Sequence, residues 1–166
     1  VCTPRSPACA ACPVARWCLA RAHGTQAERP AQKRRAAVPS YDVGTAVLRT
    51  RDGRLLLVRR PGDGLLGGMW SFPGEVVRDG ESVAEAAARA GRAASGLAAV
   101  GPGRPAGSVV HVFSHRREVY HVFVFAVPVA GADGAAARGV WVAPEELERY
   151  ALPAAQRRIL GLVEAG

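Results

Sequence analysis

Cysteines near the start of the chain are the residues best suited to hold a metal. The 166 residues contain four of them, Cys2, Cys9, Cys12 and Cys18, separated by six, two and five residues. Disulfides are the weakest interpretation, because nothing marks the chain as secreted. Cys9 and Cys12 make a good half-site for zinc, but the other two do not form a second short knuckle. Four thiolates from one compact loop suit an iron–sulfur cluster best, and zinc remains the alternative.

The spacing of these cysteines, with Pro13 after the third, resembles the 4Fe–4S loop of the endonuclease III class of DNA glycosylases. In that class the loop follows the last helix of the catalytic domain. The resemblance implies a 4Fe–4S cluster held by all four cysteines.

Positive charge is concentrated at the same end of the chain. The formal net charge is +8, and residues 1–40 carry seven of the 22 Lys and Arg residues but only Glu28 among the 14 acidic ones. This asymmetry indicates a polyanion contact at one end, or a solvated arginine-rich tail. Residues 22–39 contain two prolines and no hydrophobic periodicity, which predicts a basic linker. Its cluster of Lys33, Arg34 and Arg35 would follow phosphates or simply be solvated.

From Tyr41 onward the pattern is that of a mixed α/β (α+β) domain. Asp52-Gly53 between two β-rich runs predicts a hairpin. Ser82 and Glu85 have capping-box spacing at the start of a helix, and Gly96 is placed to end it. The expected strands cover 42–50, 54–60, 108–113, 118–129 and 138–143, and the glycine-rich stretch 64–76 leads into a further short strand. The expected helices cover 81–97, 144–150 and 153–166.

The stretch from Leu55 to Leu97 resembles the core of a Nudix fold. In active Nudix hydrolases, carboxylates of a loop–helix box gather divalent cations around a pyrophosphate. Of that box, Glu81, Arg89 and Gly96 match, while Glu75 stands at the first glycine position. The three ligand positions on the helix are alanines: Ala90, Ala93 and Ala94. A methyl group cannot bind Mg²⁺, so we expect the metal site to be lost. Glu81 would then pair with Arg89.

The order of these parts resembles the C-terminal portion of an adenine DNA glycosylase of the MutY type, over essentially the whole chain. The resemblance implies an iron–sulfur loop at 1–21, a linker at 22–39 and a Nudix-like domain at 40–166, a mixed sheet flanked by helices. The first residue is Val1, so we expect a piece of a longer protein whose catalytic helical domain is absent. We therefore assign no catalytic residue and expect this piece alone to be non-catalytic.

The family's recognition element, a Phe-Ser-His triplet on a β-hairpin, occurs here as Phe113, Ser114 and His115. A hairpin tip can enter a duplex where its flanking strands cannot. Oxidation of guanine to 8-oxoguanine turns the N7 acceptor into a donor, and a serine hydroxyl can meet either edge. Arg116 and Arg117 would hold the nearby DNA backbone. Without the resemblance, Phe113 would be a half-buried strand residue and the next two ordinary turn residues.

The family's complete enzyme removes adenine mispaired with 8-oxoguanine or guanine in base excision repair. The resemblance therefore implies a lesion-recognition and DNA-binding portion whose partner is duplex DNA with 8-oxoguanine opposite adenine. No apolar run approaches the roughly 20 residues of a membrane span. We expect a monomer in the bacterial cytoplasm, acting at the nucleoid. The alternatives are an active MutT-type nucleotide pyrophosphohydrolase and a zinc-binding nucleic-acid adaptor.

Overall fold

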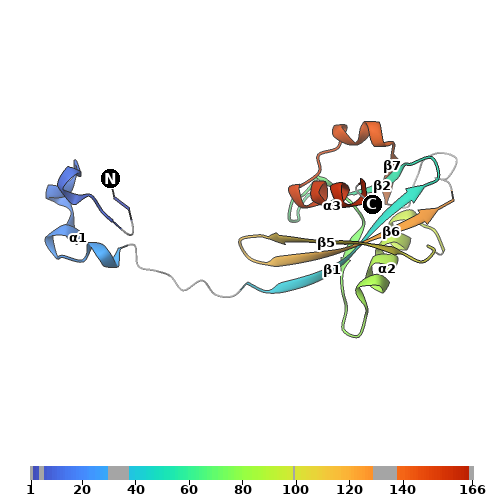
Figure 1. The fold of residues 1–166 in the computed structure, drawn as a ribbon, viewed down its shortest axis with the longest axis horizontal. Helices are drawn as coiled ribbons and strands as arrows, with labels where there is room; N and C mark the ends of the chain where they lie inside the picture. The colour runs from blue at the N-terminus through green and yellow to red at the C-terminus, as the bar shows by residue number, and fades with distance from the viewer. Residues whose placement is uncertain (1, 4–5, 30–37, 99, 129–137, 165–166) are drawn as a thin grey trace. The chain divides into compact units, whose positions relative to one another are not determined.

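The computed structural model describes residues 2–3, 6–29, 38–98, 100–128 and 138–164. The chain divides into two compact units, residues 1–37 and residues 38–166 (Figure 1). Among the described residues, no helix is long and apolar enough to cross a membrane.

The first unit consists of short helical turns. Regular structure extends into the range predicted as a linker, where 26–28 form a 3-10 helix. The elements are the 3-10 helices η1 (Cys9–Ala11), η2 (Ala15–Trp17) and η3 (Gln26–Glu28), and the α-helix α1 (Leu19–Ala22). The boundary between cysteine loop and linker stays a prediction.

The second unit is built on a mixed seven-stranded sheet, which confirms the predicted fold class. Its main strand order is β3-β2-β1-β6-β5, with β4 paired to β1 and β7 paired to β2. The central pair β1–β6 is parallel, and the other pairs are antiparallel. The strands are β1 (Ser40–Thr50), β2 (Leu55–Arg59), β3 (Trp70–Ser71), β4 (Gly74–Val76), β5 (Arg104–Val112), β6 (Arg117–Val127) and β7 (Gly139–Val142).

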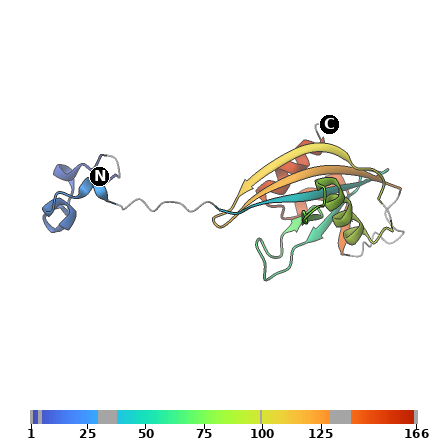
Figure 2. The same cartoon turned by 90° about the horizontal axis from the view of Figure 1, so that it is seen from below.

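Helices α2 (Val83–Ser95) and α3 (Ala154–Glu164) cover opposite faces of the sheet (Figures 1 and 2). Successive side chains of a strand point to opposite faces, so β1 serves both cores. Val43 and Val47 join the core under α3, whereas Ala46 and Leu48 join the core under α2. This double burial explains why the middle of β1 is a nearly continuous apolar run.

Helix α2 begins and ends as its sequence predicts. The Ser82 hydroxyl accepts a hydrogen bond from the Glu85 backbone N–H, and the Glu85 carboxylate accepts one from the Ser82 N–H, which completes the capping box. Gly96 ends the helix in the left-handed conformation with φ of 74°. Pro144 also begins a helix, but residues 144–149 form the 3-10 helix η4 (Pro144–Arg149).

The absence of a side chain at Gly44 lets α2 lie directly on β1. A Cβ atom at this position would come within 3.0 Å of the Ala87 nitrogen, the Val83 carbonyl oxygen and the Ala86 Cβ. Two of these three atoms belong to the helix backbone, which cannot move aside alone. Gly44 therefore sets the distance between the helix and the sheet.

Candidate functional site

The four cysteines of the first unit line one cavity of roughly 60 Å³. Cys9 begins η1, while Cys12 and Cys18 are the residues at which η1 and η2 end in extended conformation. Pro13 accounts for the first of these ends, because a residue before proline disfavours the helical region. The two tight turns thus bring thiols that are up to 16 positions apart to a common space.

The residues around this cavity fit an iron–sulfur cluster. Four thiols that line one space can serve together as the ligands of a multi-atom cluster. A tetrahedral zinc site would use the same four thiols. Arg21 and Arg29 line the same cavity, and cationic neighbours stabilise thiolates.

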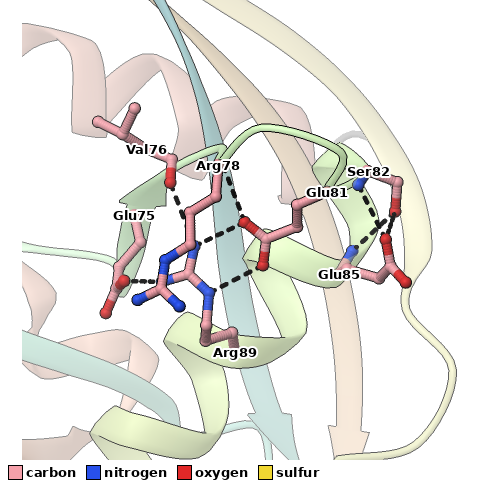
Figure 3. A network of polar contacts seen from close by, with 7 residues as sticks. All are labelled: Glu75, Val76, Arg78, Glu81, Ser82, Glu85 and Arg89. Atoms are coloured by element: carbon pink, nitrogen blue, oxygen red, sulfur yellow. Dashed lines mark hydrogen bonds and ion pairs between the residues drawn. The ribbon is translucent and has the colours of Figure 1, made fainter.

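Glu81, the carboxylate of the Nudix box that this chain keeps, and the nearby Glu75 are engaged in local contacts around Arg89 (Figure 3). The Arg89 guanidinium donates two hydrogen bonds of 2.8 Å to Glu81, one to Glu75 and one of 3.1 Å to the Val76 carbonyl oxygen. Glu81 also accepts a 3.0 Å bond from the Arg78 backbone N–H. The predicted Glu81–Arg89 pair is therefore confirmed.

Glu85 is likewise occupied at the start of α2, where it accepts bonds of 2.8 Å and 2.7 Å from the Ser82 N–H and hydroxyl. Hydrogen bonds from the Ser82 side chain and then from its backbone lower the pKa of Glu85. The capping role predicted for Glu85 is confirmed.

The alanines at the three ligand positions line a cavity of about 330 Å³ beside α2. Arg59 and Arg138 line the same cavity, and Glu75 is the one carboxylate there among the described residues. Because Glu75 is paired with Arg89, methyl and guanidinium groups dominate the place where a Nudix box presents carboxylates. Divalent cations require oxygen ligands, so this cavity is poorly suited to Mg²⁺.

The Phe-Ser-His triplet lies at the turn between β5 and β6. The Phe113 backbone N–H donates a 2.8 Å hydrogen bond to the Arg116 carbonyl oxygen, which closes a two-residue loop. Ser114 and His115 are exposed at its tip, and their Oγ and Nδ1 atoms are 3.5 Å apart. Phe113 is half-buried, with its ring edge-on to the His111 ring at a centroid distance of 4.4 Å. The structure thus brings the triplet together at one exposed turn.

The arginines after the triplet point to different partners. The Arg116 guanidinium pairs with Glu118 and lies 5.7 Å from the centre of the Tyr41 ring. The Arg117 guanidinium donates a 2.9 Å hydrogen bond to the Ser40 hydroxyl. Lys33, Arg34 and Arg35 lie outside the described residues.

A polar cleft of about 260 Å³ beside the turn was missed by the sequence reasoning. Glu118 and Tyr120 are only 4% and 5% exposed, and the Tyr120 hydroxyl donates a hydrogen bond to the Glu118 carboxylate. Burial, and then that hydrogen bond, raise the pKa of Tyr120. The alternation of residues along β6 could have revealed the buried carboxylate. Glu118 lies two residues from Tyr120 and four from Val122, so all three share the inward face of the strand.

Known protein families match both units of the chain. A model of the NUDIX domain matches residues 44–162. A model of the iron–sulfur binding domain of endonuclease III matches residues 2–18, which include all four cysteines.

Among curated proteins, the adenine DNA glycosylase of Rattus norvegicus is 27% identical over 214 residues, which cover 99% of this chain and 40% of the rat protein. The enzyme of Mus musculus is 31% identical over 112 residues, covering 66% of this chain and 22% of the mouse protein. The chain therefore spans two fifths or less of the length of these relatives.

Solved structures show the same relationship. The MutT protein of Methanosarcina mazei Go1 superposes with a TM-score of 0.66 and 26% identity, covering 78% of this chain and 96% of that one. The C-terminal domain of mouse MUTYH, solved in complex with human PCNA, superposes with a TM-score of 0.63 and 25% identity. The match covers 75% of this chain and 87% of that one. The chain thus belongs to the NUDIX domain family, and with its endonuclease III-type iron–sulfur motif it is similar throughout to the C-terminal part of MutY-type adenine DNA glycosylases.

Proposed function

We propose that this chain is the lesion-recognition and DNA-binding part of an adenine DNA glycosylase that acts on adenine opposite 8-oxoguanine or guanine in base excision repair. One observation carries the proposal. A Phe-Ser-His triplet, in which Ser114 and His115 are exposed, lies at a hairpin tip of a NUDIX domain whose three metal-ligand positions on the helix are alanine. Glycosidic cleavage is assigned to the remainder of the parent protein, and this chain alone is non-catalytic.

The hairpin tip supplies the chemistry of recognition. The N7 of guanine accepts a hydrogen bond, whereas that of 8-oxoguanine donates one and a new carbonyl oxygen lies next to it. The exposed Ser114 hydroxyl can accept a hydrogen bond from the N7–H of 8-oxoguanine or donate one to its C8 carbonyl oxygen. Phe113 is braced by the His111 ring and would wedge against a base, while His115 would donate to a base edge or a phosphate.

Arg117 and the basic residues Lys33, Arg34 and Arg35 would contact the DNA backbone in a sequence-independent way. Arg116, which the sequence analysis grouped with these residues, is set apart because its guanidinium is paired with Glu118. Such contacts position the protein on a duplex but do not read the lesion.

A 4Fe–4S cluster held by Cys2, Cys9, Cys12 and Cys18 is part of the proposal. When bound, it cross-links the four thiolates and couples the folding of the first unit to metal binding. Anaerobically purified chain should contain about four irons and four acid-labile sulfides, and a Cys12→Ser variant should lose them. Zinc without sulfide would instead support a zinc-binding nucleic-acid adaptor.

The test of lesion recognition is DNA binding at two salt concentrations. Duplexes carrying 8-oxoguanine or guanine opposite adenine are compared, for the wild-type chain and for Ser114→Ala. Loss of one base-reading contact should reduce the preference for 8-oxoguanine about tenfold. Ser108→Ala is the matched control, because Ser108 is exposed on the same hairpin but lies away from the tip. Equal, strongly salt-dependent binding of both duplexes by the wild type would leave only a basic DNA-holding module.

The similarity to a MutT protein makes nucleotide hydrolysis the second candidate function. Robust hydrolysis of nucleoside triphosphates with Mg²⁺ or Mn²⁺ would contradict the non-catalytic interpretation, since Ala90, Ala93 and Ala94 offer no oxygen ligand.

A further inference from the structure

We propose that the ion pair between Arg116 and the buried Glu118 sets the geometry of the recognition turn, so that both are positioning residues and Arg116 is not a phosphate contact. The inference rests on the proposed role of the Phe113–Arg116 turn. Both residues lie outside the triplet: Arg116 ends the turn, and Glu118 lies on the strand that follows it.

Glu118 is an unusual residue for the inner face of a strand. Its side chain is only 5% exposed, and its partners are the Arg116 guanidinium and the Tyr120 hydroxyl. Residues 116, 118 and 120 alternate along the chain, so their side chains share one face, and all three line the 260 Å³ cleft. A buried carboxylate is costly unless it is paired and hydrogen-bonded. Glu118 therefore holds the Arg116 side chain in place.

The ion pair connects the turn to the rigid sheet. Arg116 is the last residue of the turn and its carbonyl oxygen accepts the 2.8 Å bond from the Phe113 N–H. Glu118 lies within β6, which is paired on both sides, to β1 and to β5. When Glu118 fixes the Arg116 side chain, it also restricts the backbone that closes the loop. The orientation of Ser114 follows from that loop.

The start of β1 provides a second support. Because β1 and β6 are parallel, Ser40 and Tyr41 lie beside Arg117 and Glu118, at the base of the turn. The Arg116 guanidinium lies over the Tyr41 ring, 5.7 Å from its centre, and the Arg117 backbone N–H donates a 2.9 Å bond to the Pro39 carbonyl oxygen. A guanidinium that pairs with a carboxylate and lies over an aromatic ring is restricted in its orientation.

These contacts also make Arg116 a poor ligand for a DNA phosphate. A phosphate would have to compete with Glu118 for the guanidinium, and success would leave a buried carboxylate without its cationic partner. The Arg116 side chain is only 31% exposed. Arg117 has no such conflict, because its partner is the neutral Ser40 hydroxyl.

An electrostatic role and a positioning role of Glu118 predict different effects for Glu118→Gln. This change removes a negative charge near the DNA, so an electrostatic role alone would strengthen binding to every duplex. A positioning role predicts about a tenfold loss of the preference for 8-oxoguanine over guanine, as for loss of a base contact. Arg116→Gln should produce the same loss. Arg117→Gln is the matched control. It should weaken the binding of both duplexes equally and reduce the slope of log affinity against log salt concentration by about one.

Order at the tip is the second readout and does not depend on DNA. In ¹⁵N relaxation measurements on the free chain, Glu118→Gln and Arg116→Gln should lower the heteronuclear NOE of the Ser114 and His115 amides, whereas Arg117→Gln should not. An unchanged NOE together with an unchanged preference for 8-oxoguanine would overturn the proposal. Tighter binding of Glu118→Gln to both duplexes with an unchanged ratio would overturn it as well.

Failure of the proposed function can be distinguished from failure of this inference. If the wild type shows no preference for 8-oxoguanine, the proposed function fails, and the NOE at the tip decides the positioning role alone. If Glu118→Gln does not fold, Arg116→Lys tests the positioning role instead, because lysine keeps the positive charge but lacks the planar guanidinium. A preference lowered about threefold or more in Arg116→Lys supports positioning, and a retained preference overturns it.

Discussion

Replacing Arg89 by methionine should destabilise the NUDIX domain by about 3 kcal/mol. The Arg89 and Glu81 side chains are 19% and 16% exposed, so their two 2.8 Å bonds are largely shielded from water. Hydrogen bonds to charged groups contribute roughly 1.5–3 kcal/mol, and a shielded carboxylate that loses its partner adds to the cost. Glu75 is 43% exposed and adds little, since pairs near the surface are worth about 0–1 kcal/mol. Methionine keeps the aliphatic stem, which leaves the polar contacts as the difference.

Urea unfolding followed by far-UV circular dichroism measures this loss. With a slope of about 1.5 kcal/mol per molar urea, the midpoint should fall by roughly 2 M while the slope stays constant. Arg149→Met is the control, because Arg149 is 77% exposed and pairs with Glu146 at 3.2 Å on the surface. Its expected cost is below about 0.5 kcal/mol. Equal costs for the two variants would refute the structural role of Arg89 and leave Glu81 available for other chemistry.

Three further changes test the scaffold. Gly44→Ala should cost about 3 kcal/mol or more in urea unfolding, because its methyl group would clash with the backbone of α2. Ser82→Ala should lower the melting temperature by roughly 4 °C through loss of the N-cap. The pKa of Glu85 is lowered in the fold, so its contribution to the stability of the domain is present above the ordinary pKa of 4.5 and is lost as the pH falls through the folded pKa. The destabilisation caused by Ser82→Ala should therefore shrink in acid. The pKa of Tyr120 is raised by burial and by its hydrogen bond to Glu118. Its contribution to the stability of the domain is therefore present below the ordinary pKa of 10 and declines as the pH rises above that value. Tyr120→Phe should remove that alkaline decline, measured by urea unfolding at about pH 8 and about pH 11.

Much of the fold was predictable because it depends on contacts between residues close in sequence. The capping box of Ser82 and Glu85 spans three residues, and the hairpin at Gly53 needs only a turn with positive φ, here 88°. Runs rich in β-forming residues predicted the main strands. The cysteine spacing and the three alanines in α2 likewise indicated which chemistry each unit could and could not support.

Other features depend on parts of the chain that meet only in the folded protein. Glu118 looks like a polar residue beside a turn, yet the start of β1 and the cleft beside it make it a buried partner of Arg116. Gly44 looks like a weak strand residue, yet it is where α2 contacts the sheet. The sequence by itself determined the residue types, the local turns and caps and the loss of the metal ligands. Which side chains are buried, and therefore which charges must pair, was decided by the tertiary structure, because desolvation depends on every segment that covers a group.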